Sequence, residues 1–401
     1  MGTITIVMIA LTAVALVFGT LFGLKRGRNR SILRLILIIG CIAGAIFLRE
    51  PVIEFLIELD VVQELLNSLA SEMPSGFQYY MLVLVGIILN ILVYFILFFL
   101  LRLVSWLILY PIIKIFVKTE IDKKRGAGAL IGLIQGIVIV FAVLVPLNGM
   151  AVQFDRLTKV DISMFSGQSG SGGEKMGAEQ KSEGFSLEIL EEVGLGEYAD
   201  SELSKVYNAI GGWYFDMLSS VEITEDVKID FSDVCDVTVG LVGIMSSTTE
   251  IGEGFEMIND GTATPVQKEQ KLNEVGSSFS QLGKTINQMN KGSKLLLNYI
   301  LDSLAQGEEG FDISLEDLDF TSMGKAFTSL GNYYKNDEVT ANEAKDIVDG
   351  LVYNWSIIEP MLGSQIIINM EGDSEQNFIV ALEQVEQSQK TKIMQVFGIN
   401  V

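Results

Sequence analysis

The sequence predicts an all-α membrane protein: a four-helix transmembrane bundle followed by a mainly α-helical extracytoplasmic domain. Four long apolar segments lie within residues 1–148, and the chain of 401 residues is 49% hydrophobic. Residues 1–148 carry 12 Lys+Arg and 8 Asp+Glu, a net charge of +4, whereas residues 149–401 carry 16 and 42, a net charge of −26. Such asymmetry between the two parts of a chain indicates two different environments.

The predicted spans are residues 3–24, 31–48, 81–101 and 126–148. A helix of about 20 apolar residues, at 1.5 Å rise per residue, spans a ~30 Å hydrocarbon core. Each of the four segments is close to this length. The charges KRGRNR follow the first segment, whereas a cleavable signal peptide carries them before its apolar core. We therefore expect the first segment to be a span. Residues 49–80 have apolar positions at helical spacing and predict an amphipathic helix at the outer surface. The apolar pattern after residue 101 predicts a kinked continuation along the cytoplasmic surface.

Basic residues of the membrane region gather on one side of the predicted spans, and Arg49 stands nearly alone on the other. By the positive-inside rule, both termini are then outside. The basic cluster that we expect to face lipid consists of Lys25, Arg26, Arg28, Arg30, Lys114, Lys118, Lys123, Lys124 and Arg125. Anionic lipid would attract it by about 1 kcal/mol per residue. A simple topology signal explains the same cluster, so both interpretations stay open.

Glycines recur at four-residue spacing in the predicted spans. The set is Gly19, Gly23 and Gly27 in the first span, Gly40 and Gly44 in the second, and Gly128, Gly132 and Gly136 in the fourth. Small residues at this spacing let helix backbones approach closely. We predict that the first and fourth spans pack along these glycines. The alternative is that the glycines face lipid, and a homo-oligomer stays open as well.

The chain resembles the colicin V production protein family over roughly residues 1–150. The resemblance is carried by GLKRG at residues 23–27, the span directly after it, and GALIGLIQG at residues 128–136. It implies a bacterial cytoplasmic membrane protein with four spans. Members of this family have a poorly defined biochemical activity, so the resemblance implies no reaction. The long acidic tail is not part of the family pattern.

The sequence divides into three regions. We predict a four-span membrane domain at 1–150, a juxtamembrane segment and Gly/Ser-rich flexible linker at 151–184, and an acidic helical domain at 185–401. Helix start signals occur at Thr264 with Gln267, at Ser314 with Asp317, and at Thr340 with Glu343. Strands are predicted only at 227–231 and 365–369. Gly252, Gly276 and Gly324 each begin a Gly-x-x-Phe pattern, which indicates either close helix packing or chance.

The sequence contains little that indicates catalysis. It has no histidine, which excludes Ser-His-Asp and Cys-His catalysis, and the acidic charge argues against nucleic-acid binding. Cys41 and Cys235 lie in different regions, so we expect no disulfide. The acidic cluster Asp226, Asp230, Asp233 and Asp236 lacks the calcium-loop spacing and suits a helix start better.

We therefore expect no enzyme, cofactor or metal, and we expect the polar residues Asn90 and Gln135 to bind neighbouring helices. The expected function is an envelope scaffold, sensor or accessory factor that acts on unknown protein partners through its acidic domain. The alternative is a transport or secretion channel formed by oligomerised membrane domains.

Overall fold

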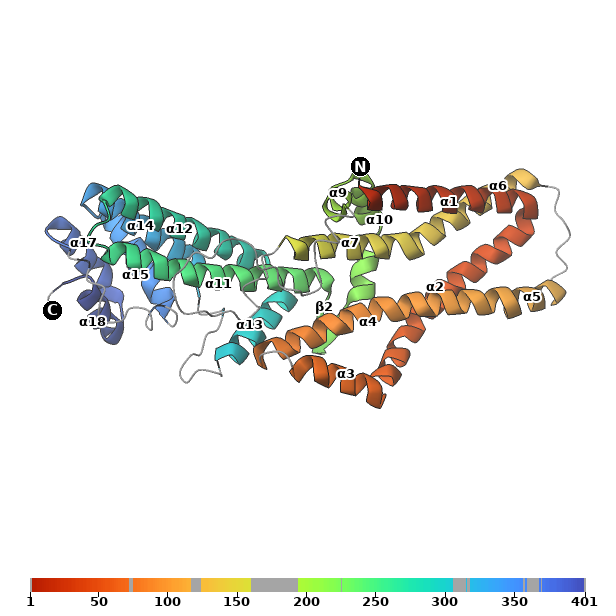
Figure 1. Ribbon diagram of the computed structural model, residues 1–401, viewed down its shortest axis with the longest axis horizontal. Coiled ribbons are helices and arrows are strands. Elements are labelled where there is room, and N and C mark those ends of the chain that lie inside the picture. The colour runs from red at the N-terminus through yellow and green to blue at the C-terminus, as the bar shows by residue number, and fades with distance from the viewer. Residues whose placement is uncertain are drawn as a thin grey trace. The chain divides into compact units, whose positions relative to one another are not determined.

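The computed structural model describes residues 2–71, 75–116, 124–159, 194–224, 226–305, 315, 318–355, 358, 368 and 370–399 (Figure 1). They divide into two compact units. The first comprises residues 1–161 and 168–235, and the second comprises residues 162–167 and 236–401. The fold is mostly helical, and long apolar helices precede a second helical region, which confirms the predicted fold class.

The first unit is built on four long apolar helical segments. They are α1 (Thr3–Arg26), α2 (Arg28–Ile57), α4 (Ser75–Val104) and α6 (Arg125–Ile139). The helix α4 continues through η1 (Ser105–Leu109) into α5 (Tyr110–Phe116), and α6 continues through η2 (Val140–Leu144) into α7 (Val145–Thr158). Mean hydropathies of 2.5 to 2.9 make all four long and apolar enough to cross a membrane.

Large apolar side chains on these helices point away from the protein. Phe18, Phe99, Leu103 and Leu130 are each more than half exposed, at 51%, 56%, 54% and 62%. A contiguous apolar surface of this kind is unfavourable in water and favourable in lipid. The exposed faces therefore support the membrane location that the hydropathy indicates.

Two predicted boundaries in the first unit differ from the observed ones. The segment predicted as one amphipathic helix is divided, because α2 continues through Pro51 to Ile57 and a separate α3 (Asp60–Ser71) follows. Residues 151–158, which open the predicted juxtamembrane segment, are helical, since α7 ends only at Thr158. Ala151, Val152 and Phe154 continue its apolar pattern without a helix breaker. The rest of the predicted linker, from 160 to 184, lies outside the described residues.

Residues 194–235 belong to the first unit, whereas the sequence predicted a separate domain from residue 185. They form α9 (Leu195–Ala199), α10 (Glu202–Ser219) and an antiparallel hairpin of β1 (Val221–Thr224) and β2 (Val227–Ile229). The helix α10 packs on α7 and α4, and α9 packs on α7 and α1. In Figure 1, α10 runs transverse to α4 and α7. The hairpin confirms a strand at the start of the predicted 227–231 segment.

The second unit is a helical bundle. It contains most of α11 (Phe231–Asn259), then α12 (Pro265–Gln288), α13 (Lys291–Ala305), α14 (Phe320–Asn336) and α15 (Ala341–Tyr353). The chain ends in α17 (Asp373–Ala381), η5 (Leu382–Gln384) and α18 (Gln387–Val396). Of residues 365–369, predicted as a strand, only Ile368 is described, and its N–H donates to the Val396 carbonyl at 2.8 Å.

Local capping signals set the starts of the second unit's helices. Capping boxes begin α12 at Thr264 with Gln267 and α15 at Thr340 with Glu343, which confirms two predicted starts. The third predicted start, Ser314 with Asp317, lies outside the described residues. The helix α14 is instead capped by Asp319, whose carboxylate accepts from the N–H groups of Thr321 and Ser322.

Glycines hold α12 and α14 close together in the core of the second unit. A β-carbon built on Gly276 would lie 2.6 Å from the Gly324 carbonyl oxygen. The rings of Phe279 and Phe327, three residues after these glycines, stack with centroids 5.9 Å apart. A β-carbon built on Gly252 would have no atom within 4 Å. The pattern at Gly276 and Gly324 is therefore a packing motif, and the copy at Gly252 does not share its contact.

Candidate functional site

The glycines of α1 and α6 meet at a close helix crossing. A β-carbon built on Gly132 would lie 2.2 Å from the carbonyl oxygen of Gly19. The corresponding distances are 2.5 Å from Gly128 to the Gly23 oxygen and 2.7 Å from Gly136 to the Ala15 oxygen. Gly27 also lies against Gly128, because a β-carbon built on Gly128 would be 2.9 Å from the α-carbon of Gly27. These backbones leave no room for any side chain, so the glycines face a helix and not lipid.

Gly40 and Gly44 of α2 are placed differently. A β-carbon on Gly40 would have nothing within 4 Å, and one on Gly44 would meet only the Leu101 side chain, at 3.0 Å. The four-residue spacing is therefore shared by glycines with different surroundings. The spacing alone did not distinguish glycines that contact another helix backbone from glycines that do not.

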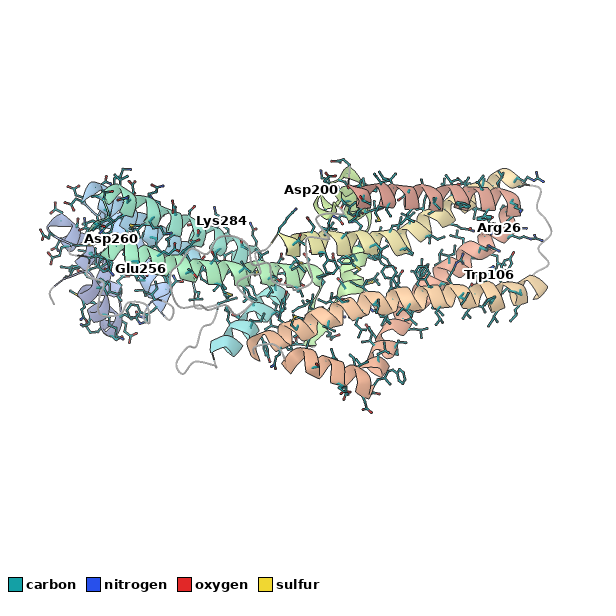
Figure 2. All side chains as sticks on the ribbon, viewed as in Figure 1. Arg26, Trp106, Asp200, Glu256, Asp260 and Lys284 are labelled. Atoms are coloured by element: carbon teal, nitrogen blue, oxygen red, sulfur yellow. The ribbon has the colours of Figure 1, made fainter. Side chains whose placement is uncertain are left out.

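The predicted basic cluster is only partly described. Lys25, Lys124 and Arg125 are exposed, whereas Arg26, Arg28 and Arg30 are partly buried. Lys118, Lys123 and the side chain of Lys114 lie outside the described part. Figure 2 shows Arg26 and Trp106 toward the same end of the long helices. Two arginines outside the predicted cluster, Arg34 and Arg102, lie close enough to Arg26 for the three charges to repel one another.

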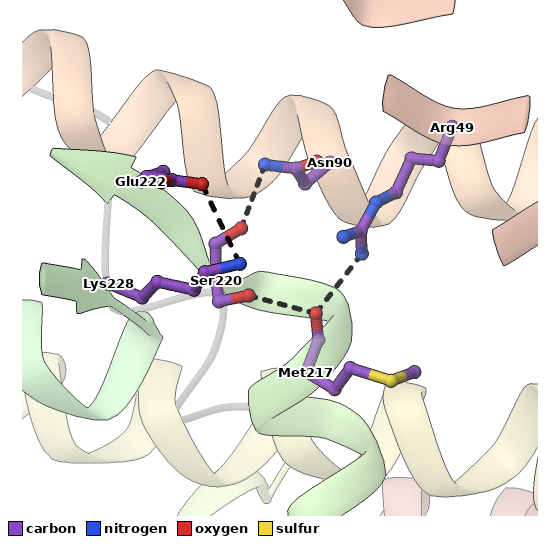
Figure 3. A network of polar contacts seen from close by, with 6 residues as sticks. All are labelled: Arg49, Asn90, Met217, Ser220, Glu222 and Lys228. Atoms are coloured by element: carbon purple, nitrogen blue, oxygen red, sulfur yellow. Dashed lines mark hydrogen bonds and ion pairs between the residues drawn. The ribbon is translucent and has the colours of Figure 1, made fainter. Parts of the chain in front are cut away.

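Buried polar side chains of the membrane helices bind the backbone of α10 and the residue after it (Figure 3). We define the polar junction as Arg49, Asn90, Tyr94 and Asn148 with the groups of residues 198–220 that they bind. The Arg49 guanidinium donates to the carbonyl oxygens of Met217 and Leu218, at 3.2 and 2.8 Å. The Asn90 amide donates to the Ser220 carbonyl at 3.3 Å. The last carbonyls of a helix lack intrahelical donors, so these contacts satisfy the end of α10.

Tyrosines extend the polar junction. The Tyr214 hydroxyl donates to the Tyr94 hydroxyl at 2.6 Å, and Tyr94 donates to the Ala142 carbonyl at 3.0 Å. Closer to α9, the Tyr198 hydroxyl donates to the Asn148 side-chain oxygen at 2.6 Å. Asn148 in turn donates to the Asn208 side-chain oxygen at 2.7 Å. Buried polar groups are costly without partners, so this network fixes α9 and α10 to the membrane helices.

Sequence reasoning did not identify the junction. Asn90 was expected to bind a neighbouring span, yet it binds Ser220, from the segment assigned to the external domain. Gln135 does bind between membrane helices, since its amide donates to the Ser31 carbonyl of α2. The available signal was Arg49, which stands nearly alone among the basic residues of the predicted spans at its end and is only 6% exposed. A buried arginine requires acceptors, and these come from Met217 and Leu218.

The face of α10 that points away from the junction is apolar. Val206, Ile210 and Trp213 are 52%, 52% and 62% exposed and follow helical spacing. Charged side chains on the exposed face are confined to the first turn, at Glu202 and Lys205, which pair at 2.8 Å. The helix thus presents an apolar stripe beside helices whose own exposed surfaces are apolar.

Carboxylates of the predicted acidic cluster cap the start of α11. Asp230 accepts from the N–H of Asp233 at 3.1 Å, and Asp233 accepts from the N–H of Asp230 at 3.0 Å. Burial, and then repulsion by Asp233, raises the pKa of Asp230 to about 6. Among the described residues, no group of three or more His, Cys, Asp or Glu side chains is arranged to hold a metal. The arrangement of Asp230 and Asp233 is that of a helix cap.

The second unit has a shallow, open depression on the exposed face of α12, which we call the α12 groove. It is lined by Val266, Glu269, Gln270, Asn273, Glu274 and Ser277. The Asn273 side-chain oxygen is buried and has no hydrogen-bond donor in the described part of the chain. Val266 is 65% exposed, and Glu274 is exposed as well. The exposed Glu274 carboxylate beside the exposed Val266 can bind a segment that brings a cationic donor and an apolar residue.

No family model, no curated protein and no solved structure matches the chain.

Proposed function

We propose that this chain is a multi-pass envelope protein that acts as a scaffold, sensor or accessory factor by binding protein partners through its acidic helical unit. The observation that carries the proposal is the α12 groove, where the exposed side chains of Val266, Gln270 and Glu274 lie on one surface of the helix. The four long apolar helical segments with exposed apolar side chains support a membrane location.

The chemistry of the groove selects a basic, amphipathic partner segment. Residues 236–401 hold 25 Asp+Glu and 10 Lys+Arg, a net charge of −15, which attracts basic partners at long range. Glu269 already pairs with Lys335 at 2.6 Å, so Glu274 is the carboxylate in the groove that would bind an incoming Lys or Arg. Val266 would contact an apolar residue of the same segment.

Site-specific photocrosslinking in cells tests the proposal. A crosslinkable residue replaces Gln270 or Ser277 in the groove, or Gln387 on α18 as the control, all three being exposed. We expect a discrete adduct from both groove positions, abolished by Glu274→Lys and retained with Glu383→Lys. Adducts that are equal at the control position, or insensitive to Glu274→Lys, would contradict binding in the groove.

The transport alternative has less support. Asn90, Gln135 and Asn148 donate to carbonyl or amide oxygens of the protein itself, so they are engaged in packing. Ion or solute flux in reconstituted vesicles is the measurement that distinguishes transport from scaffolding.

A further inference from the structure

We propose that Arg26, Arg34 and Arg102, together with Tyr110, form a binding site for the phosphate of an anionic phospholipid. The four residues come from α1, α2, α4 and α5, so the site exists only when these helices are assembled. The proposal is independent of the partner-binding function, because it concerns the first unit alone.

The first step of the argument is charge. The guanidinium groups of Arg26, Arg34 and Arg102 are near enough to act on one another electrostatically. None of the three is ion-paired with a carboxylate in the described part of the chain. Uncompensated positive charge in a partly buried setting is unfavourable, so an anion is the expected counterpart.

The second step is the orientation of the side chains. The Arg34 guanidinium carbon lies 4.5 Å from the centroid of the Tyr110 ring, and that of Arg26 lies 4.8 Å from the centroid of the Phe22 ring. Stacking on an aromatic ring holds the guanidinium plane in place while its edge stays available for hydrogen bonds. The Nε atoms of Arg34 and of Arg30, one turn earlier, are buried without acceptors among the described residues. A phosphate would supply oxygens in the geometry that guanidinium groups bind bidentately.

The third step identifies the source of the phosphate. Apolar side chains exposed to the surroundings flank the arginines, including Phe22 at 44%, Leu103 at 54% and Trp106 at 60%. A free phosphate ion would gain nothing from this apolar border, whereas the acyl chains of a phospholipid would contact it. The arginines lie at the end of the spans that the charge rule predicts to be cytoplasmic, where anionic lipids are enriched.

Trp106 allows the occupant to be detected directly. It lies four residues from both Arg102 and Tyr110 along the chain, and it becomes the single tryptophan when Trp213 and Trp355 are replaced by phenylalanine. The full-length protein is reconstituted in phosphatidylcholine vesicles that contain increasing fractions of brominated phosphatidylglycerol or brominated phosphatidylcholine. Brominated acyl chains quench only nearby tryptophan. We expect half-maximal quenching at a fraction of phosphatidylglycerol at least tenfold lower than of phosphatidylcholine, because three guanidinium groups attract the anionic headgroup.

Matched variants distinguish specific binding at the three arginines from general electrostatic attraction of anionic lipid to basic residues. We expect the double variant R34Q/R102Q to remove the preference for phosphatidylglycerol. The control double variant K25Q/R125Q removes two exposed charges at the same end and should change the preference no more than about twofold. The variant R34K/R102K keeps the charge but not the guanidinium group, and we expect it to lose most of the preference for phosphatidylglycerol. If R34Q/R102Q does not fold, R34K/R102K alone tests whether the guanidinium groups bind the lipid.

Three results would overturn the proposal. The first is equal quenching of the unmodified protein by the two lipids. The second is a preference that survives in R34K/R102K, or one that falls equally in K25Q/R125Q. The third is full displacement of brominated phosphatidylglycerol by millimolar inorganic phosphate, which would assign the site to the free ion.

Discussion

Gly132 lies where the backbones of α1 and α6 approach each other closely. A β-carbon there would lie 2.2 Å from the Gly19 oxygen and 2.8 Å from the Gly23 α-carbon, both backbone atoms that cannot rotate away. We expect Gly132→Ala to lower the free energy of unfolding in detergent by about 1–3 kcal/mol, the usual cost of overpacking. Gly40→Ala is the control, since nothing lies within 4 Å of the corresponding β-carbon. Equal thermal stability of the two variants would show that the glycine contact is not tight.

Asp230 gives the first unit a pH dependence. Its pKa is raised to about 6 by burial and by repulsion from Asp233, and Asp216 adds to that repulsion. The nearby Arg156 donates to Ser232 at 3.1 Å. An unfolded aspartate has a pKa near 4, so the native state binds this proton more tightly than the unfolded state. The contribution of the protonated Asp230 side chain to the free energy of unfolding is therefore lost as the pH rises from about 4 to about 6.

Replacing Asp230 tests this dependence. Asp230→Asn keeps an oxygen for the Asp233 N–H and removes the buried charge. We expect the variant to be more stable than the parent at pH 7, with a difference that shrinks toward pH 4.5, in thermal unfolding followed by circular dichroism. The control, Asp226→Asn, replaces an exposed carboxylate on the same hairpin and should leave the pH profile unchanged. A constant difference between Asp230→Asn and the parent across this range would refute the titration.

At the residue scale, the sequence was informative where one short-range rule decided the outcome. Gly128, Gly132 and Gly136 are buried, and their four-residue spacing indicated a packing face. The partners of Arg49 were not predictable, because Met217 and Leu218 lie 168 and 169 residues away and offer only backbone oxygens. Any residue type can supply a carbonyl, so such contacts leave no mark on the sequence. The grouping of Arg26, Arg34 and Arg102 likewise depends on how three helices assemble.

At the scale of elements, α10 depends on Arg49. Arg49 is 6% exposed and donates to the last carbonyls of that helix. Arg49→Met keeps an apolar stem but removes the donors, which leaves buried carbonyls unsatisfied at a cost of about 1–3 kcal/mol. We expect faster hydrogen–deuterium exchange in the peptide covering residues 202–220. Glu50→Gln, at the exposed neighbouring position, is the control and should not alter that exchange. Unchanged exchange in Arg49→Met would mean that other contacts hold α10.

The apolar stripe of α10 predicts contact with lipid. Val206, Ile210 and Trp213 are exposed, and α10 packs on α4 and α7, which are themselves apolar outside. Trp213 becomes a single probe when Trp106 and Trp355 are replaced by phenylalanine. We expect brominated phosphatidylcholine to quench it strongly and to shift its emission to the blue. The control places the single tryptophan by Lys205→Trp at the charged first turn, where quenching should be weaker. Equal weak quenching at both positions would place the stripe in water.

The elements that the sequence predicted well carry their signals locally. The capping boxes at Thr264 and Thr340 need only four residues each, and both were found where predicted. The helix α7 continues through residues 151–158, for which no secondary structure was predicted from the sequence. Residues 194–235 were assigned to the external domain because they follow a Gly/Ser-rich stretch. Their actual association comes from buried hydrogen bonds with helices far away in sequence.

At the scale of the whole molecule, the membrane helices alternate in direction. The amino end of α1 and the carboxyl end of α7 both meet residues 194–199, since Gly2 approaches Gly194 and Asp155 approaches Gly196. The start of α1 and the end of α7 therefore lie at the same end of the first unit. A fifth helix, α11, is long enough to cross a membrane, but its mean hydropathy of 1.2 is far below the 2.5 to 2.9 of the other four. Its Phe255 is buried against Phe327 of the second unit. We therefore expect four spans, with α11 outside the membrane.

Cysteine labelling determines the number of spans and their direction together. In a background with Cys41→Ala and Cys235→Ala, both buried sites, single cysteines replace the exposed residues Glu64, Lys124, Asp200 and Asp260. Figure 2 labels Asp200, in the first unit, and Asp260, after the end of α11. We expect an impermeant thiol reagent to label positions 64, 200 and 260 in intact cells, and position 124 only after permeabilisation. Labelling at 124 together with protection at 64 and 200 would reverse the orientation. Labelling at 200 with protection at 260 would mean that α11 crosses the membrane and that the acidic unit faces the cytoplasm.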